Sequence, residues 1–295
     1  MSATFGSPVP GVALSAAPAL PQKPGPLHQV EFVVEIVGPK SVPATAAAAL
    51  LTSEWQGVLG FPRVWVMAPK DTVWQPLTTS VSGSYDSLVL TWPYMGAGGH
   101  LTSRSAITLA GTAERFATGV QRRALTLPPP NDVDHAVRAV REVVERLDIG
   151  VSISVEFAIP VAEEPLWRTA MELGLNLNGS GEFVWGDPAQ VTLVPLQEPM
   201  RFTLGAVRAG RQHEGVTAGF STPQSVNPFV SLRAALHVAD EYAKRFQGLI
   251  FGDGGEPITP KLRAEYEDNL NAAVAAFAQV GLVSGSAEAL RLFGG

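Results

Sequence analysis

The sequence contains no cysteine and has few charged residues. The absence of cysteine excludes disulfides, thiol nucleophiles, iron–sulfur clusters and zinc sites that use thiolate ligands. Charged residues make up 16% of the chain, and 21 basic against 27 acidic residues give a net charge of −6, which argues against a broad basic surface for nucleic acids. No stretch approaches the roughly 18–20 uninterrupted apolar residues of a membrane-spanning helix, so we expect no membrane span.

What the chain does contain is apolar material, at 46% of its 295 residues. A typical domain has about 100–200 residues, so this length and composition predict two domains with real hydrophobic cores. The 24 prolines and 29 glycines indicate many turns.

The first 28 residues are rich in proline, alanine, glycine and serine and show no hydrophobic period. This composition predicts a disordered arm over residues 1–28. The first basic residue, Lys23, follows the only apolar stretch instead of preceding it, and prolines interrupt that stretch. We therefore expect no secretory signal peptide and a cytoplasmic protein.

Residues 30–37 alternate between apolar and polar, which is typical of a half-buried strand. Further strands are predicted at 63–69, 86–93 and 124–127. Helices are predicted from Pro43 to about residue 55, over 104–119 with Thr102 or Ser103 as the cap, and from Asp132 to 147.

The second half repeats this order of elements. Strands are predicted at 151–159, 182–185, 190–196, 201–207, 215–223 and 249–251, and helices from Pro165, from Pro228 to 246 and from Pro260 to about 280. The sequence thus predicts an α+β protein of two tandem units, residues 29–149 and 150–295. Each is expected to be a mostly antiparallel sheet with helices on one face, in the split βαβ class.

The second unit also resembles a known family. The residues that carry the resemblance lie between about 170 and 280: Gly215-Val216-Thr217 in a strand, Pro223, then Phe229, Leu232, Ala239 and Ala243 in a helix, then Gly248, Asp253, Ile258-Thr259, Leu262 and Tyr266. This pattern is similar to the C-terminal domain of the bacterial cell-division protein ZipA, and through the internal repeat the likeness extends to the first unit.

The resemblance implies a binding module and no catalysis. In that family the uncovered face of the sheet forms a shallow apolar groove, which receives the C-terminal tail of the tubulin-like protein FtsZ. A few apolar anchors dominate the affinity in such a mode. The strand at 151–159 departs from this pattern, because it places Ser152, Ser154, Glu156 and Ala158 opposite its apolar set.

Strands with large apolar residues on both faces are the candidates for a peptide groove. Aromatic and methionine side chains are favoured at such surfaces because they bury a large area. The alternative for each is an ordinary core position, or a face buried by the other unit. The candidates are Trp65, Met67, Trp74 and Trp92 in the first unit and Phe183 and Trp185 in the second.

Motifs typical of catalytic or metal-binding sites are weak. The five histidines are scattered without metal-ligand spacing. Glu163 and Glu164 are interpreted as favourable charges at a helix start, and Arg122 and Arg123 as a solvated helix end or a site for an acidic tail. We therefore predict no catalytic residues, no metal and no cofactor.

The preferred hypothesis is a non-catalytic adaptor that binds a protein or peptide tail, with an FtsZ-like partner as the candidate. One alternative is an enzyme or small-molecule binder with a pocket between the units. The other is an assembly protein whose sheet faces bind each other, giving a homodimer.

Overall fold

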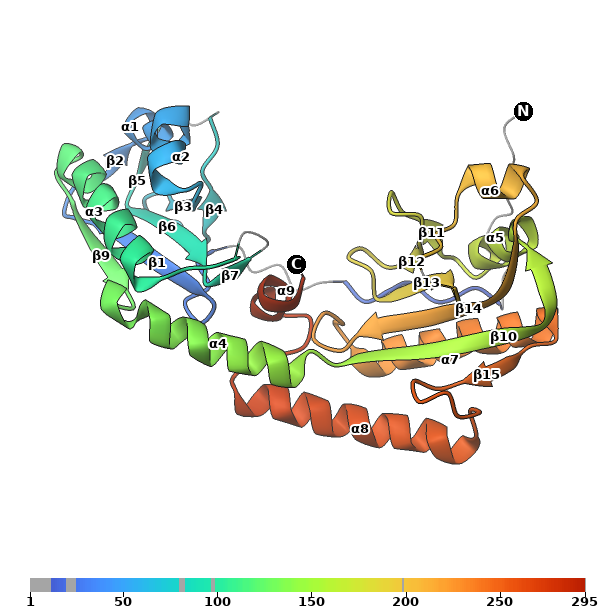
Figure 1. The fold of residues 1–295 in the computed structure, drawn as a ribbon. Helices are drawn as coiled ribbons and strands as arrows, with labels where there is room; N and C mark the ends of the chain where they lie inside the picture. Colours follow the sequence, from blue (N-terminus) through green and yellow to red (C-terminus); the bar gives the residue numbers. More distant parts are fainter. Residues whose placement is uncertain (1–11, 20–24, 80–82, 97–98, 198, 295) are drawn as a thin grey trace. The chain divides into compact units, whose positions relative to one another are not determined.

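The computed structural model describes residues 12–19, 25–79, 83–96, 99–197 and 199–294 (Figure 1). Much of the predicted N-terminal arm, at residues 1–11 and 20–24, lies outside the described residues. Helices and antiparallel sheets alternate along the chain, so the predicted α+β class is confirmed.

The chain divides into two compact units. Of the described residues, those within 25–146 and 290–294 form the first unit, and those within 147–289 together with 12–19 form the second. The division near residue 147 lies close to the predicted boundary at 150. Among the described residues, however, 12–19 belong to the second unit and 290–294 to the first, so each unit includes a segment from the opposite end of the chain.

The first unit is built on a five-stranded antiparallel sheet with the order β4-β3-β6-β1-β9. Two short antiparallel pairs accompany it: β2 with β5, which are distant in sequence, and the hairpin of β7 and β8. The strands are β1 (Glu31–Val37), β2 (Val42–Pro43), β3 (Arg63–Met67), β4 (Gln75–Pro76), β5 (Ser84–Tyr85), β6 (Ser87–Pro93), β7 (Met95–Gly96), β8 (Gly99–His100) and β9 (Arg123–Leu127).

Helices cover one face of this sheet. They are α1 (Ala44–Ala48), the 3-10 turn η1 (Ala49–Leu51), α2 (Ser53–Leu59), α3 (Ser103–Gly119), η2 (Pro130–Asp132) and α4 (Val133–Leu147). The Thr102 side chain caps α3 by accepting a hydrogen bond from the Ser105 N–H, as its position predicts. Apolar residues from α1, α3 and α4 join those of the strands in one buried core.

The second unit contains a six-stranded antiparallel sheet with the order β11-β12-β13-β14-β10-β15. Helix α7 packs along β10 and β14, and α5 and α8 complete the same core (Figure 1). The elements are β10 (Gly150–Ala162), α5 (Glu163–Glu172), β11 (Asn176–Leu177), β12 (Phe183–Trp185), β13 (Val191–Pro195), α6 (Leu204–Arg208), β14 (Gln212–Ser221), α7 (Pro228–Phe246), β15 (Leu249–Phe251) and α8 (Pro260–Gln279). Helix α9 (Ala287–Phe293) begins in the second unit and ends in the first, because the division falls between residues 289 and 290.

Four strands in each unit share one arrangement. The order β3-β6-β1-β9 in the first sheet matches β13-β14-β10-β15 in the second. In each sheet the first long strand, β1 or β10, lies between the strand that precedes a long helix, β6 or β14, and the short strand that follows that helix, β9 or β15. The order of elements predicted from the sequence is therefore present in both units.

Several local predictions are wrong. The helix predicted from Pro43 to about residue 55 is interrupted at Thr52, which follows η1 and caps α2, and α5 begins at Glu163 instead of Pro165. Residues 201–207 are not a strand, because the Thr203 side chain accepts a hydrogen bond from the Ala206 N–H and starts α6. The predicted disordered arm includes residues 12–17, whose apolar side chains pack on the core of the second unit. Their packing leaves no periodic signal because this segment belongs to no helix or strand.

Candidate functional site

The two faces of the first sheet differ in how they are covered. One face contributes Phe32, Val34, Val64, Leu90 and their neighbours to the core beneath the helices. Strand alternation points the intervening side chains to the opposite face, which we call the open face. It carries residues from β1, β3, β6 and β9, which are Glu31, Val33, Glu35, Val37, Arg63, Trp65, Met67, Ser87, Val89, Thr91, Arg123, Leu125 and Leu127. Glu31, Val33, Val89 and Thr91, on its inner strands β1 and β6, are at most 1% exposed, so only the flanking side chains of this face are accessible.

Strand register aligns four of these side chains across the sheet. Trp65 pairs with Val89, Val89 pairs with Glu35, and Glu35 pairs with Leu125. We call this line the Trp65 row. Trp65 is half-buried and Leu125 is 51% exposed, so apolar surface remains accessible at both ends of the row. Met67 is half-buried one step along β3, on the same face.

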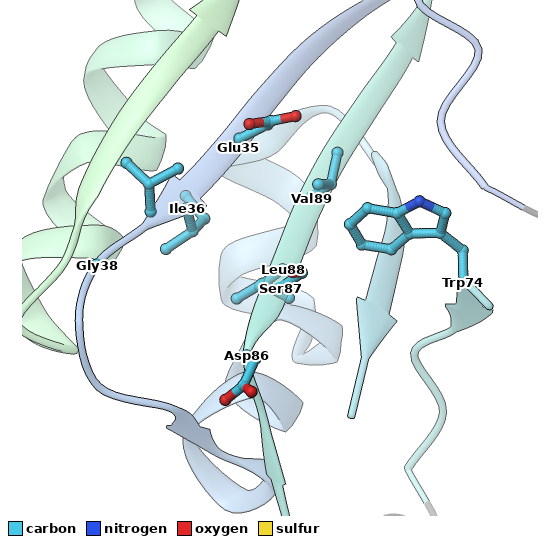
Figure 2. A pocket seen from close by; sticks show the side chains of 9 residues that line it. Glu35, Ile36, Gly38, Trp74, Asp86, Ser87, Leu88 and Val89 are labelled. Carbon is cyan, nitrogen blue, oxygen red and sulfur yellow. The ribbon is translucent and has the colours of Figure 1, made fainter. Parts of the chain in front are cut away.

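A pocket of about 240 Å³ opens beside the Trp65 row (Figure 2). Figure 2 shows the Trp74 indole beside Val89 and the Glu35 carboxylate on the neighbouring strand. Trp74 precedes the edge strand β4 and is half-buried. The structure therefore brings three of the predicted groove residues, Trp65, Met67 and Trp74, to the region of the open face. Its pocket is lined by Glu35, Ile36, Val37, Gly38, Trp74, Asp86, Ser87, Leu88 and Val89.

The chain itself covers part of this region. Gly25 lies so close to Trp74 that a Cβ atom there would be 2.7 Å from the indole Cδ1. Two residues later, the N–H of the buried Leu27 donates to Glu31 Oε2 at 3.0 Å. Residues 25–27 thus hold Trp74 from one side, which explains why its exposure is only partial.

Glu31 marks the other end of the open face. Its carboxylate is fully buried and lies 3.5 Å from Arg291 of α9, within the first unit. Burial raises the pKa of Glu31, and the hydrogen bond from Leu27 opposes this shift. The same charge adds to burial in raising the pKa of Tyr94 to about 12.

Arg122 fixes the strand ends beside the pocket. Its guanidinium is buried and donates to the carbonyl oxygens of Ile36, Lys40 and Asp86. A Cβ atom on Gly38 would lie 2.5 Å from Arg122 Cγ, so only glycine permits this approach. Arg122 is therefore neither the solvated residue nor the acidic-tail contact that the sequence suggested, whereas Arg123 is exposed.

Three predicted groove residues are corrected. Trp92, Phe183 and Trp185 lie on the helix-covered faces and are buried in the two cores. The Trp92 indole N–H donates to the Leu59 carbonyl oxygen at 2.6 Å, and Phe183 packs edge-on against Trp167 of α5. The helices need large partners on the strands they cover, and these side chains fill that space.

The open face of the second sheet is polar at its centre. Ser152 and Glu156 are exposed and Ser154 is half-buried, as their alternation predicts. Ser154 Oγ lies 3.0 Å from Thr217 Oγ1 on the adjacent strand. Apolar residues flank this centre, with Val184 and Val194 half-buried on one side and Leu249 68% exposed on the other. The row across the second sheet thus runs from Val194 through Thr217 and Ser154 to the half-buried Phe251, with hydroxyl side chains at its centre.

A buried polar cluster in the second unit was missed from the sequence. Glu163 turns inward, where Oε1 accepts hydrogen bonds from the Thr203 N–H at 2.7 Å and the Trp167 indole N–H at 3.1 Å. Its Oε2 lies 2.9 Å from His213 Nε2, and both side chains are almost fully buried. The cluster joins the start of α5 to β14 and to the segment before α6. Neither Glu163 nor His213 lines a described pocket, which favours a structural role.

A second cavity of about 400 Å³ lies at the β7–β8 hairpin. Its lining combines Met95 and Leu292 with His100, Arg141 and Arg291. Arg291 is already paired with Glu31, and the hairpin tip, residues 97–98, lies outside the described residues. We assign this cavity no role.

The described ranges contain neither a metal-binding cluster nor a helix suited to a bilayer. Among those residues, no group of three or more His, Cys, Asp or Glu side chains could hold a metal ion. None of the helices in the described part of the chain combines the length and apolar character needed to cross a bilayer.

No family model matches the chain. The search of curated proteins likewise finds no match.

Proposed function

We propose that the protein is a non-catalytic adaptor whose first unit binds a short peptide tail of a partner protein on its open face. The observation that supports this most is the Trp65 row beside the 240 Å³ pocket. Trp65, Trp74 and Met67 remain half-buried around a sheet face whose central side chains are buried, and aromatic and methionine side chains are the ones that peptide and protein interfaces favour.

The size of the pocket favours a peptide over a small molecule. Sites for small molecules enclose about 300–1,000 Å³, and the pocket beside Trp74 is smaller. It suits one apolar side chain of a ligand whose other residues lie along the sheet. The Glu35 carboxylate has no ion pair with any described residue, so a basic residue next to the apolar anchor would complete the match.

The partner that we propose is the C-terminal tail of an FtsZ-like protein, which would make this a cell-division adaptor. This step rests on the resemblance to the ZipA C-terminal domain. The first unit is the better candidate for the binding face, because the centre of the second unit's open face presents serine, threonine and glutamate side chains beside glycines.

Fluorescence anisotropy with a labelled FtsZ C-terminal tail peptide tests the proposal. We expect saturable binding with a Kd in the micromolar range, about −8 kcal/mol. Trp65→Ala should weaken it at least about 10-fold, because truncating an aromatic anchor removes about 2 kcal/mol or more. Val194→Ala, on the open face of the second sheet, is the matched control and should leave the Kd unchanged.

Other outcomes would replace the proposal. No binding at millimolar peptide would exclude the FtsZ tail, and equal affinity for wild type and Trp65→Ala would exclude this face. The self-assembly alternative predicts a doubled mass by light scattering that Trp65→Asp returns to 31.1 kDa.

A further inference from the structure

The second unit holds a segment of its own chain in the manner of a bound peptide. Residues 12–17, which we call the N-terminal segment, belong to no helix or strand. Val12, Leu14 and Ala17 pack against the second unit's core, whereas Ser15 and Ala16 are exposed. One side of the segment therefore faces the protein and the other faces solvent.

Three hydrogen bonds fix the segment, and all of them use its main chain. The Leu14 N–H donates to the Leu173 carbonyl oxygen at 2.9 Å. The Trp185 indole N–H donates to the Ser15 carbonyl oxygen at 2.9 Å, and His237 Nε2, 2.7 Å from the Val12 carbonyl oxygen, donates to it. The segment thus provides a donor to the carbonyl at the end of α5 and acceptors to side-chain N–H groups of β12 and α7.

The polar groups that contact the segment would otherwise lack hydrogen-bond partners within their own elements. The Leu173 carbonyl belongs to the last turn of α5, where helix carbonyls have no partner within the helix. Trp185 is 4% exposed, and a buried indole N–H requires an acceptor. Gly186 has φ +92°, and a Cβ atom there would lie 3.0 Å from the Ala17 Cβ, so the surface is shaped closely around the segment.

From these contacts we infer that the second unit carries a peptide-binding groove, formed by Leu173, Trp185, Gly186 and His237, which the N-terminal segment occupies in cis. When this segment leaves, the groove accepts a partner segment of the same chemistry. That partner is uncharged, with aliphatic residues at its first and third positions and a small residue at its sixth. Recognition through main-chain groups and apolar contacts leaves the outward positions free to vary.

This site is separate from the open face of the first unit and does not depend on the function proposed above. While the N-terminal segment is in place, the groove is closed to other peptides, because a tethered segment competes at an effective concentration of about millimolar. Displacing the segment therefore exposes a second binding activity.

The test uses the full-length chain with the substitution Leu14→Asp, which puts a charge against the apolar groove and releases the segment. A labelled peptide with the sequence of residues 9–20 is titrated by fluorescence anisotropy. We expect saturable binding to the Leu14→Asp chain and at least about 10-fold weaker binding to wild type, where the cis segment competes. A peptide that itself carries Leu14→Asp should not bind.

Ala16→Asp is the matched control, because Ala16 belongs to the same segment but is exposed. This chain should behave as wild type. A second readout follows Trp185 by ¹⁹F NMR of 5-fluorotryptophan-labelled chain. Its resonance should move in Leu14→Asp and return towards the wild-type position when the peptide is added.

Three outcomes would overturn the inference. A folded Leu14→Asp chain that binds no peptide, or whose Trp185 resonance does not move, would overturn the inference, as would equal affinity of the peptide for wild type. If circular dichroism shows that Leu14→Asp does not fold, Val12→Asp takes its place and the same outcomes decide.

Discussion

The side chain of Arg122 joins three segments of the first unit. Its guanidinium donates to carbonyl oxygens at the end of β1, in the turn at Lys40 and before β6. Burial lowers the pKa of Arg122, and the neighbouring Asp86 opposes this shift. Because an arginine pKa lies far above neutral, the group remains a cation and its hydrogen bonds are charge-assisted.

Replacing Arg122 with methionine should lower the free energy of unfolding by about 2–4 kcal/mol, because three carbonyl groups lose the guanidinium donor. Urea denaturation measures this change. Arg123→Met is the matched control; this exposed neighbour should change the free energy by less than about 0.5 kcal/mol. Equal effects of the two substitutions would show that the carbonyl contacts contribute nothing.

Glu31 predicts a pH dependence of stability. Burial raises its pKa in the folded state above the unfolded value, so folding favours the protonated form. The resulting destabilisation is absent below the unfolded pKa. It grows as the pH rises from the unfolded to the folded pKa, and above the folded pKa it stays constant. Glu31→Gln has no such charge, so the free energy of unfolding of the variant minus that of wild type should increase as the pH rises across this interval.

Urea denaturation of both proteins between pH 4 and pH 8 measures the difference. As a second readout, the pKa of Tyr94 should fall in Glu31→Gln, since the Glu31 charge contributes to raising it. A stability difference that is constant with pH, or that moves in favour of wild type as the pH rises, contradicts this account.

At the scale of elements, the Glu163 cluster attaches α5 to the rest of the second unit. Glu163→Ala would leave the Thr203 N–H, the Trp167 indole and His213 without this acceptor. Removing one partner of such a buried pair costs about 3–5 kcal/mol. Chemical denaturation should show a loss of this size. Glu164→Ala removes only an exposed pair with Arg168 and should cost less than about 1 kcal/mol.

Helices were the most predictable elements of the fold. Pro228 and Pro260 each occupy the first position of a helix, and Asn227 and Thr259 cap them. These local signals act within one turn, so they can be read from sequence alone. Helix α6 was missed because its residues also fit an alternating strand pattern, and only the Thr203 cap distinguishes the two.

The candidate site was only partly predictable. Alternation identifies two faces of a strand but does not say which face the helices cover. In β3 the aromatic residue is on the open face, whereas in β12 Phe183 and Trp185 are on the covered face. The pairings of Arg122, Glu163 and the N-terminal segment join residues distant in sequence, which a local pattern does not reveal.

At the scale of the whole molecule, each unit has a hydrophobic core of its own. Substitutions in one core should therefore act mainly on that unit. Hydrogen exchange followed by mass spectrometry should show that Arg122→Met accelerates exchange within residues 31–127, and that Glu163→Ala does so within residues 150–279. Equal acceleration in both units by either variant would mean that they unfold together.

The central claim is that the open face of the first unit receives a peptide tail. The measurement that tests it most directly is ¹⁹F NMR of the full-length chain with 5-fluorotryptophan at its six tryptophan positions, titrated with the FtsZ tail peptide. The account predicts saturable shifts of the Trp65 and Trp74 resonances, while those of the buried Trp92 and Trp185 stay in place. No shift at about millimolar peptide, or a shift confined to Trp167 and Trp185 of the second unit, would contradict it.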